Sequence, residues 1–136
     1  MIRSLEEPAV GFPSLGLSKT MLRALKHARY ATPSPIQAAF IPEALEGRDV
    51  LGQAKTGTGK TAAFGIPLLE MLEGRGQGPQ AIILAPTREL AQQIVGELQK
   101  LSLGTDAAIL GVFGGEPIER QLRALSRGVD LIVGTP

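Results

Sequence analysis

Residues 54–61 contain glycine, lysine and threonine in an order that suits the binding of phosphate groups. Gly57 and Gly59 allow backbone conformations that are closed to other residues, so successive N–H groups can converge on one anion. Lys60 can then reach the outer phosphates of a nucleotide, and the Thr61 hydroxyl can bind Mg²⁺. The alternative interpretation is a glycine turn that carries a lysine and binds nothing.

The residues on both sides of this segment predict the strand and the helix that such a loop requires. Residues 49–53 read as a short buried strand. From Lys60 onward, Phe64, Leu68 and Leu72 recur at every fourth position, which predicts a helix whose N-terminus faces the phosphates. We therefore predict that the segment binds a nucleoside triphosphate. The residues expected to contact it are Ala54, Lys55, Thr56, Gly57, Thr58, Gly59, Lys60 and Thr61.

Four nearly continuous apolar runs indicate the strands of a sheet that is covered on both faces. They lie at residues 49–53, 80–85, 107–113 and 129–133. Helical periodicities separate the later runs, one at Leu90, Ile94, Leu98 and Leu101 and one at Ile118, Leu122 and Leu125. This alternation predicts an α/β domain with a parallel sheet and right-handed crossovers.

Two further helices are predicted ahead of the first apolar run. Ser18 is suited to cap the first helix and Ser34 the second, with Pro35 at the first helical position. The apolar residues that mark these helices are Met21, Leu22, Leu25 and Ala28 in the first, and Ile36, Phe40 and Leu45, expected to face inward, in the second.

The composition bounds the class of protein. With 136 residues, of which 43% are hydrophobic, the chain has enough material for one folded core. The absence of cysteine excludes disulfides and thiolate chemistry, and no apolar run approaches the ~20 residues that span a bilayer. The net charge of +1 gives no electrostatic sign of nucleic-acid binding. We expect a cytoplasmic protein without a membrane partner.

The sequence offers no acidic group in the place where a P-loop nucleoside triphosphatase needs one. That group holds Mg²⁺ and positions the attacking water at a second strand end. Asp130 opens its apolar run, which places it at the wrong end of a parallel sheet. We therefore expect a fragment cut inside its domain near Pro136, weakly stable by itself and unable to hydrolyse ATP at a useful rate.

Several segments, taken in order, resemble the DEAD-box ATP-dependent RNA helicases. Residues 54–61 resemble motif I of this family, residues 86–91 its motif Ia, and Gly114-Gly115 its paired glycines, while Thr135-Pro136 resembles the opening of its next motif. The resemblance covers the chain from about Phe12 onward. It implies the front part of a first RecA-like domain, and thus an α/β fold: an incomplete parallel-sheet P-loop NTPase domain with an N-terminal helical Q-motif segment.

The resemblance also implies a division of the chain and an adenine site. The implied parts are a tail at residues 1–11, a Q-motif segment at 12–40 and a truncated ATP-binding domain at 41–136. Residues 33–37, Pro-Ser-Pro-Ile-Gln, resemble the core of the Q motif, and Phe12 lies 25 residues before Gln37, as the isolated aromatic of the family does.

By this resemblance Phe12 stacks on adenine, Gln37 reads its edge, and the carbonyl near Thr32 takes part. A side-chain amide offers the donor and the acceptor that complement the N6 and N7 edge of adenine. The alternatives are a solvated helix residue at position 37 and an aromatic plug at position 12. One departure is visible: the family usually has Gly-Phe where this chain has Arg29-Tyr30.

The motif Ia and glycine-pair segments are implied to bind the RNA backbone. Thr87 and Arg88 lie where a strand ends and a helix begins, so a hydroxyl, a guanidinium and free N–H groups can meet a phosphate. The alternatives are a helix cap at Thr87, an ion pair at Arg88 and a tight glycine turn. The residues implied to contact RNA are Pro86, Thr87, Arg88, Gly114, Gly115 and Thr135.

The resemblance implies the ATP-binding and RNA-contacting portion of a helicase that couples ATP hydrolysis to RNA unwinding. Its implied cofactors are ATP and Mg²⁺, the metal being bound at Thr61. Its implied partners are RNA and a second RecA-like domain of the same polypeptide. Two other functions stay open from the sequence: a nucleotide-binding switch that unwinds nothing, and a DNA helicase of the same superfamily.

Overall fold

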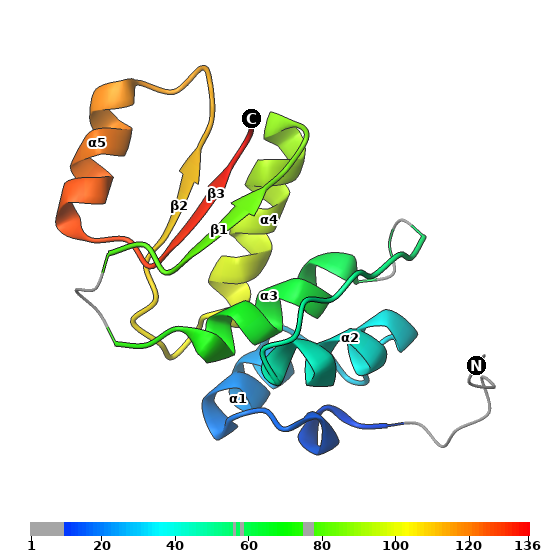
Figure 1. Ribbon diagram of the computed structural model, residues 1–136. Coiled ribbons are helices and arrows are strands. Elements are labelled where there is room, and N and C mark those ends of the chain that lie inside the picture. The colour runs from blue at the N-terminus through cyan, green and yellow to red at the C-terminus, as the bar shows by residue number, and fades with distance from the viewer. Residues whose placement is uncertain (1–9, 56, 58, 75–77) are drawn as a thin grey trace.

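The computed structural model of the chain describes residues 10–55, 57, 59–74 and 78–136. It begins with a 3₁₀ turn and three helices: Phe12–Leu15, α1 (Lys19–His27), α2 (Pro35–Leu45) and α3 (Lys60–Met71). Strands and helices then alternate: β1 (Ala81–Leu84), α4 (Arg88–Leu101), β2 (Ile109–Val112), α5 (Ile118–Arg127) and β3 (Leu131–Gly134) (Figure 1). Among the helices of these ranges, none has both the length and the apolar character of a membrane span.

The strands form a parallel sheet in the order β1-β3-β2. The central strand β3 pairs with both neighbours, and Val133 is in register with Ile83 on one side and with Gly111 on the other. The last three of the four predicted runs are therefore strands, and the predicted parallel α/β class is confirmed.

The predicted strand at residues 49–53 is wrong. This segment pairs with none of the described strands, and Leu51 in its middle is 99% exposed. It passes instead over α2, where a Cβ added to Gly52 would come within 2.9 Å of the Phe40 ring and 3.2 Å of Ile36. Figure 1 shows it beside the helices and away from the sheet. A strand requires a neighbour for its backbone hydrogen bonds, and among the described residues this segment has none.

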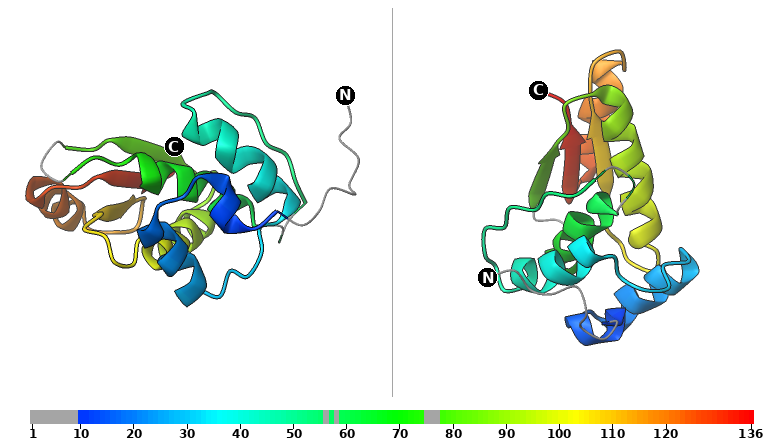
Figure 2. Two further views of the ribbon diagram at one scale, coloured as in Figure 1. Left: turned by 90° about the horizontal axis from the view of Figure 1, so that it is seen from below. Right: turned by 90° about the vertical axis from the view of Figure 1, so that its right-hand side faces the viewer.

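The core has two parts. The first lies between the 3₁₀ turn and helices α1, α2 and α3, and includes Leu25, Ile41 and Ile66. The second lies between the sheet and helices α3 and α4, and includes Leu98 and Val133. In Figure 2 the helices α3 and α4 lie to one side of the sheet. Helix α3 contributes to both parts.

The close packing of α3 on α4 depends on a glycine. A Cβ added to Gly65 would lie 2.7 Å from Cδ2 of Leu98, so a larger residue there would push the two helices apart. The helix predicted from the spacing of Leu90, Ile94, Leu98 and Leu101 is confirmed as α4, where Ile94, Leu98 and Leu101 are buried and Leu90 packs against the second core.

Two helices begin with the predicted serine caps. The Ser18 hydroxyl accepts a hydrogen bond from the Met21 N–H (3.1 Å), which caps α1. The N–H and the hydroxyl of Ser18 also donate to the two carboxylate oxygens of Glu70 (2.8 and 2.7 Å). This contact joins the start of α1 to the last turn of α3.

Helix α2 turns an inward face to the core that was predicted only in part. Gln37 and Ile41 are its buried residues. The expected Ile36, Phe40 and Leu45 are partly buried, and of these Leu45 packs against the first core. Ile36 and Phe40 instead meet the segment at 49–53, as described above. The face turned to the core runs through Gln37, Ile41 and Leu45, so the prediction is confirmed for Leu45 and wrong for Ile36 and Phe40.

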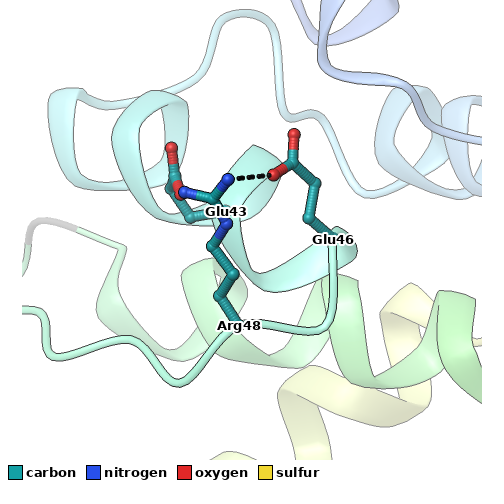
Figure 3. A network of polar contacts seen from close by, with 3 residues as sticks. All are labelled: Glu43, Glu46 and Arg48. Carbon is teal, nitrogen blue, oxygen red and sulfur yellow. Dashed lines mark hydrogen bonds and ion pairs between the residues drawn. The ribbon is translucent and has the colours of Figure 1, made fainter.

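An exposed ion-pair cluster follows the C-terminus of α2. The Arg48 guanidinium contacts the carboxylates of Glu43 (3.0 Å) and Glu46 (3.1 Å), as Figure 3 shows. The Arg48 side chain is 65% exposed, so screening by water leaves these pairs little weight in stability.

Asp130 is buried at the start of β3, at the end of the sheet opposite to the strand termini that carry the predicted sites. Its carboxylate accepts hydrogen bonds from the Ala108 N–H (2.8 Å) and from Nε2 of Gln80 (3.3 Å). These bonds connect the N-terminal ends of the strands, and they give Asp130 a structural role.

Candidate nucleotide and RNA site

The start of α3 has the backbone geometry of an anion site. Gly59 precedes the helix in the left-handed conformation (φ 82°), and no side chain of the described residues caps the helix. The first N–H groups of α3 therefore have no capping side chain as a partner, and the helix dipole favours an anion at this place. Lys60 is exposed on the first turn and Thr61 follows it. Among the other predicted contacts, Thr56 and Thr58 lie outside the described residues.

Gln37 connects the predicted adenine segment to the phosphate loop. Its Oε1 accepts a hydrogen bond from the Ser34 N–H (3.0 Å), and its Nε2 donates to the Gly59 carbonyl (3.2 Å). The first bond closes a capping box at the start of α2, because the Ser34 hydroxyl accepts from the Gln37 N–H in return. Gln37 is 3% exposed, so the alternative of a solvated helix residue is wrong.

The same contact explains the glycine at position 59. A Cβ on Gly59 would lie 2.2 Å from Nε2 of Gln37, so no side chain fits there without displacing the amide. An amide has a second N–H and a second acceptor lone pair on its oxygen. Beyond the bonds that its side chain makes with the described residues, Gln37 thus has a further donor and a further acceptor.

Phe12 is packed in the first core and is 3% exposed. Its ring meets the Tyr30 ring edge to face, with centroids 6.3 Å apart and planes at 79°. The packing role that we set beside stacking is therefore present. Phe12 also lines a cavity together with Leu22, Arg29 and Tyr30, and its stacking on adenine stays a prediction. Thr32 is exposed in the bend that leads to α2.

A cleft of about 830 Å³ adjoins the phosphate loop. Its walls come from the start of α3, from one side of α4 and from Tyr30. The polar residues that line it are Tyr30, Lys60, Thr61, Gln93, Glu97 and Lys100. The cleft therefore brings the loop, the segment before α2 and the middle of α4 to one place.

The predicted RNA contacts gather where the strands end. The Thr87 hydroxyl accepts a hydrogen bond from the Leu90 N–H (3.2 Å), so Thr87 is the cap of α4. The Arg88 guanidinium lies beside Gly115, where an added Cβ would come within 2.2 Å of Nη1. Gly115 has a φ of 85°, which favours glycine on its own account.

The remaining predicted contacts lie close to these. Thr135 donates its N–H to the Val112 carbonyl (3.3 Å) at the end of β2, while Pro86 and Gly114 are exposed beside Thr87 and Gly115 in the chain. The structure thus brings motif Ia and the glycine pair together, although more than twenty residues separate them in the sequence.

Two partners of Arg88 are absent from the sequence-based predictions. The guanidinium carbon lies 5.7 Å from the centroid of the Phe113 ring, and Nη2 lies 4.0 Å from a carboxylate oxygen of Glu116. Both residues flank the glycine pair in the sequence, and this position is the one feature of the sequence that points to a contact with Arg88. Their meeting with Arg88 depends on the sheet order and could not be derived from spacing.

The described residues are suited to bind Mg²⁺ together with a nucleotide, and not by protein side chains alone. They hold no group of three or more acidic or histidine side chains that could bind a metal by itself. Mg²⁺ usually takes one or two protein ligands and completes its shell with phosphates and water. The Thr61 hydroxyl, beside the free end of α3, is a suitable protein ligand of this kind.

Comparison with known proteins decides the family. The family model described as DEAD/DEAH box helicase matches residues 34–136. The chain belongs to this family. This DEAD-box chain is 48% identical, over 125 residues, to the DEAD-box ATP-dependent RNA helicase CshA of Bacillus cereus. It covers 24% of that protein, and the match covers 92% of the chain itself.

Solved DEAD-box structures confirm the RecA-like fold. A DEAD box protein from Methanococcus jannaschii matches 93% of this chain with a TM-score of 0.87 and 39% identity. The RNA helicase Prp28 from Chaetomium thermophilum, bound to ADP, matches 98% with a TM-score of 0.85 and 42% identity. The DEAD-box chain spans 34% of each of these structures.

Proposed function

We propose that this chain is the ATP-binding and RNA-contacting portion of an ATP-dependent RNA helicase. The observation that carries the proposal is the hydrogen bond from Gln37 to Gly59, because it joins the segment suited to adenine to the loop suited to phosphate. A relative of closely similar structure is bound to ADP, and another is named an ATP-dependent RNA helicase, which supports the same nucleotide.

On the nucleotide side, the base and the phosphates are held by separate groups. Gln37 presents its remaining donor and acceptor to adenine, with Phe12 as the stacking ring and Thr32 beside it. The N–H groups of the loop and of the first turn of α3 bind the phosphates, together with Lys60. Thr61 ligates Mg²⁺, which neutralises phosphate charge when bound.

On the nucleic-acid side, the proposed contacts are to the backbone. Arg88 offers a planar guanidinium, held over Phe113, to a phosphate. Gly115 leaves room for the Arg88 guanidinium, and Thr87 and Thr135 lie at the same strand ends. Contacts of this kind position RNA without reading its sequence.

We also propose that the chain by itself binds ATP without cleaving it. Asp130, the buried carboxylate of the described sheet, lies at its far end and is held by Ala108 and Gln80. The catalytic acid and the arginine that stabilises the transition state would then come from elsewhere in the polypeptide, including a second RecA-like domain. Binding of ATP without cleavage would also suit a nucleotide-binding switch. A measurement of RNA unwinding by the longer protein would distinguish a helicase from such a switch.

The test is calorimetric titration of the chain with ATP and with GTP, each with Mg²⁺. We expect tighter binding of ATP. Gln37→Glu should keep the capping box, because glutamate also accepts from the Ser34 N–H, but it cannot donate to Gly59 or to the base. Its preference for ATP should be lost, whereas Gln99→Glu, which puts the same charge on the exposed side of α4, should leave the preference unchanged. Equal affinity of the unsubstituted chain for ATP and GTP would contradict the adenine site.

A further inference from the structure

Tyr30 makes a contact that the phenylalanine usual at this position of the family cannot make. Its hydroxyl donates a hydrogen bond to Oε1 of Glu97, in the middle of α4. Its ring packs against the first core and meets Phe12. One side chain therefore links the segment between α1 and α2 to a helix of the sheet layer, 67 residues further along the chain.

The end of α1 sets the backbone at Tyr30. Helix α1 ends with the Arg29 N–H bonded to the Lys26 carbonyl (3.1 Å) and the Tyr30 N–H bonded to the Leu25 carbonyl (2.9 Å). This is the pattern of a Schellman motif, in which the residue at the Arg29 position is left-handed and the next residue packs back on the helix. The motif fixes the backbone only as far as Tyr30, so the bond from the hydroxyl to Glu97 is a further contact that holds the chain where it leaves α1.

Both partners of the bond line the cleft beside the phosphate loop. Thr32 follows Tyr30 by two residues, and Gln37 lies in the first turn of α2. A hydrogen bond to a carboxylate is stronger than one between neutral groups, so it is suited to hold an irregular segment against a helix.

We propose that the bond between Tyr30 and Glu97 positions the segment between α1 and α2 and so keeps the proposed adenine site, at Thr32 and Gln37, in its binding geometry. Tyr30 is thus a positioning residue that acts through Thr32 and Gln37. This inference rests on the proposed function, since it assumes that ATP binds with its base at Phe12 and Gln37.

The experiment compares the full chain with its Tyr30→Phe variant, by calorimetric titration with ATP and with inorganic triphosphate, each with Mg²⁺. The loss of one hydrogen bond should weaken ATP binding about three- to tenfold. Binding of triphosphate should not change, because that ligand uses only the phosphate loop. A merely structural role would lower the melting temperature and leave the ratio of the two affinities unchanged.

Variants of the acceptor complete the test. Glu97→Gln keeps an oxygen that accepts from the phenol and should bind ATP nearly as the unsubstituted chain does. Glu97→Ala should reproduce the Tyr30→Phe effect, and the double variant should be no weaker than either single one. Gln99→Ala, which truncates an exposed side chain of the same helix, is the matched control. Because Tyr30 is the single tyrosine and tryptophan is absent, the emission of the phenol should change in Glu97→Ala.

The outcomes separate the positioning role of Tyr30 from the proposed function of the chain. Equal ATP affinity in the unsubstituted chain and in Tyr30→Phe overturns the positioning role and leaves the proposed function standing. Equal loss of ATP and triphosphate affinity also overturns it. An unsubstituted chain that binds triphosphate and ATP with equal affinity, or binds neither, overturns the proposed adenine site and the positioning role with it.

Discussion

At the scale of single residues, two glycines are explained by the polar side chains that lie against them. Gly59 leaves room for the Gln37 amide, and Gly115 leaves room for the Arg88 guanidinium. In each case the glycine also has a positive φ, so its conformation and its missing side chain are both used. The sequence shows such glycines as turn residues, but it doesn't show which side chain occupies the space.

We predict that Gly115→Ala displaces Arg88 and weakens RNA binding. The added methyl would overlap the guanidinium, which can move because it ends a flexible side chain. Loss of one charged phosphate contact should lower the affinity for single-stranded RNA about tenfold, measured by fluorescence anisotropy. Gly104→Ala is the control: it has a similar φ of 82°, but its nearest neighbour, Cγ2 of Thr20, is 3.8 Å away. Equal RNA affinities of the two variants would count against a role of Arg88.

We predict that Arg29→Gly stabilises the chain. Arg29 is the one non-glycine residue with a positive φ (65°) among the described residues, at a position where the family usually has glycine. Relief of the left-handed strain should raise the free energy of unfolding by about 1 kcal/mol, measured by urea denaturation. Arg23→Gly, in the interior of α1, should lower it by about the same amount. A destabilised Arg29→Gly variant would show that the arginine side chain has a further contact of value.

At the scale of elements, local signals in the sequence predicted the helices well and the sheet only in part. Ser18, Ser34 and Thr87 cap their helices as serine and threonine do in general, because the cap bond is made within one turn. The strand predicted at 49–53 failed because strand pairing depends on a neighbour from a distant part of the chain. The contacts of Arg88 with Phe113 and Glu116 were missed for the same reason.

We predict that Ser18→Ala destabilises the chain more than loss of an ordinary exposed serine. The substitution removes the cap bond to Met21 and the hydroxyl bond to Glu70, while the Ser18 N–H still donates to Glu70. The free energy of unfolding should fall by about 1–2 kcal/mol, as measured by chemical denaturation. Ser126→Ala, whose hydroxyl only bonds back to the Arg123 carbonyl of α5, should have little effect. Similar losses in both variants would mean that the contact with Glu70 contributes nothing.

At the scale of the whole molecule, one face of the sheet is open among the described residues. Helices α3 and α4 pack on the face that carries Ile83 and Val133. Successive residues of a strand alternate between faces, so Ile82 and Leu84 point to the other side, where they are 66% and 69% exposed. The continuous apolar run of β1 predicted burial on both faces, and the described structure shows burial of this strand on one.

We predict that this open face makes the chain associate with itself. Apolar side chains on a flat exposed sheet, with the edge of β1 beside them, favour contacts between copies. The double variant Ile82→Thr, Leu84→Thr keeps residues that favour strands and should shift the chain toward monomer in sedimentation velocity runs at matched concentrations. Ile83→Thr, on the buried face, should instead unfold it. If the unsubstituted chain is monomeric, the exposed apolar face does not cause self-association.

Helix α3 gives the molecule a mechanical link that no single contact shows. Its first residue, Lys60, follows the phosphate loop, its Leu69 touches both parts of the core, and Glu70 holds the start of α1. Ten residues of α-helix form a rod about 15 Å long. The helix therefore connects the phosphate loop directly to the N-terminal helices and, through Leu69, to the packing behind the sheet.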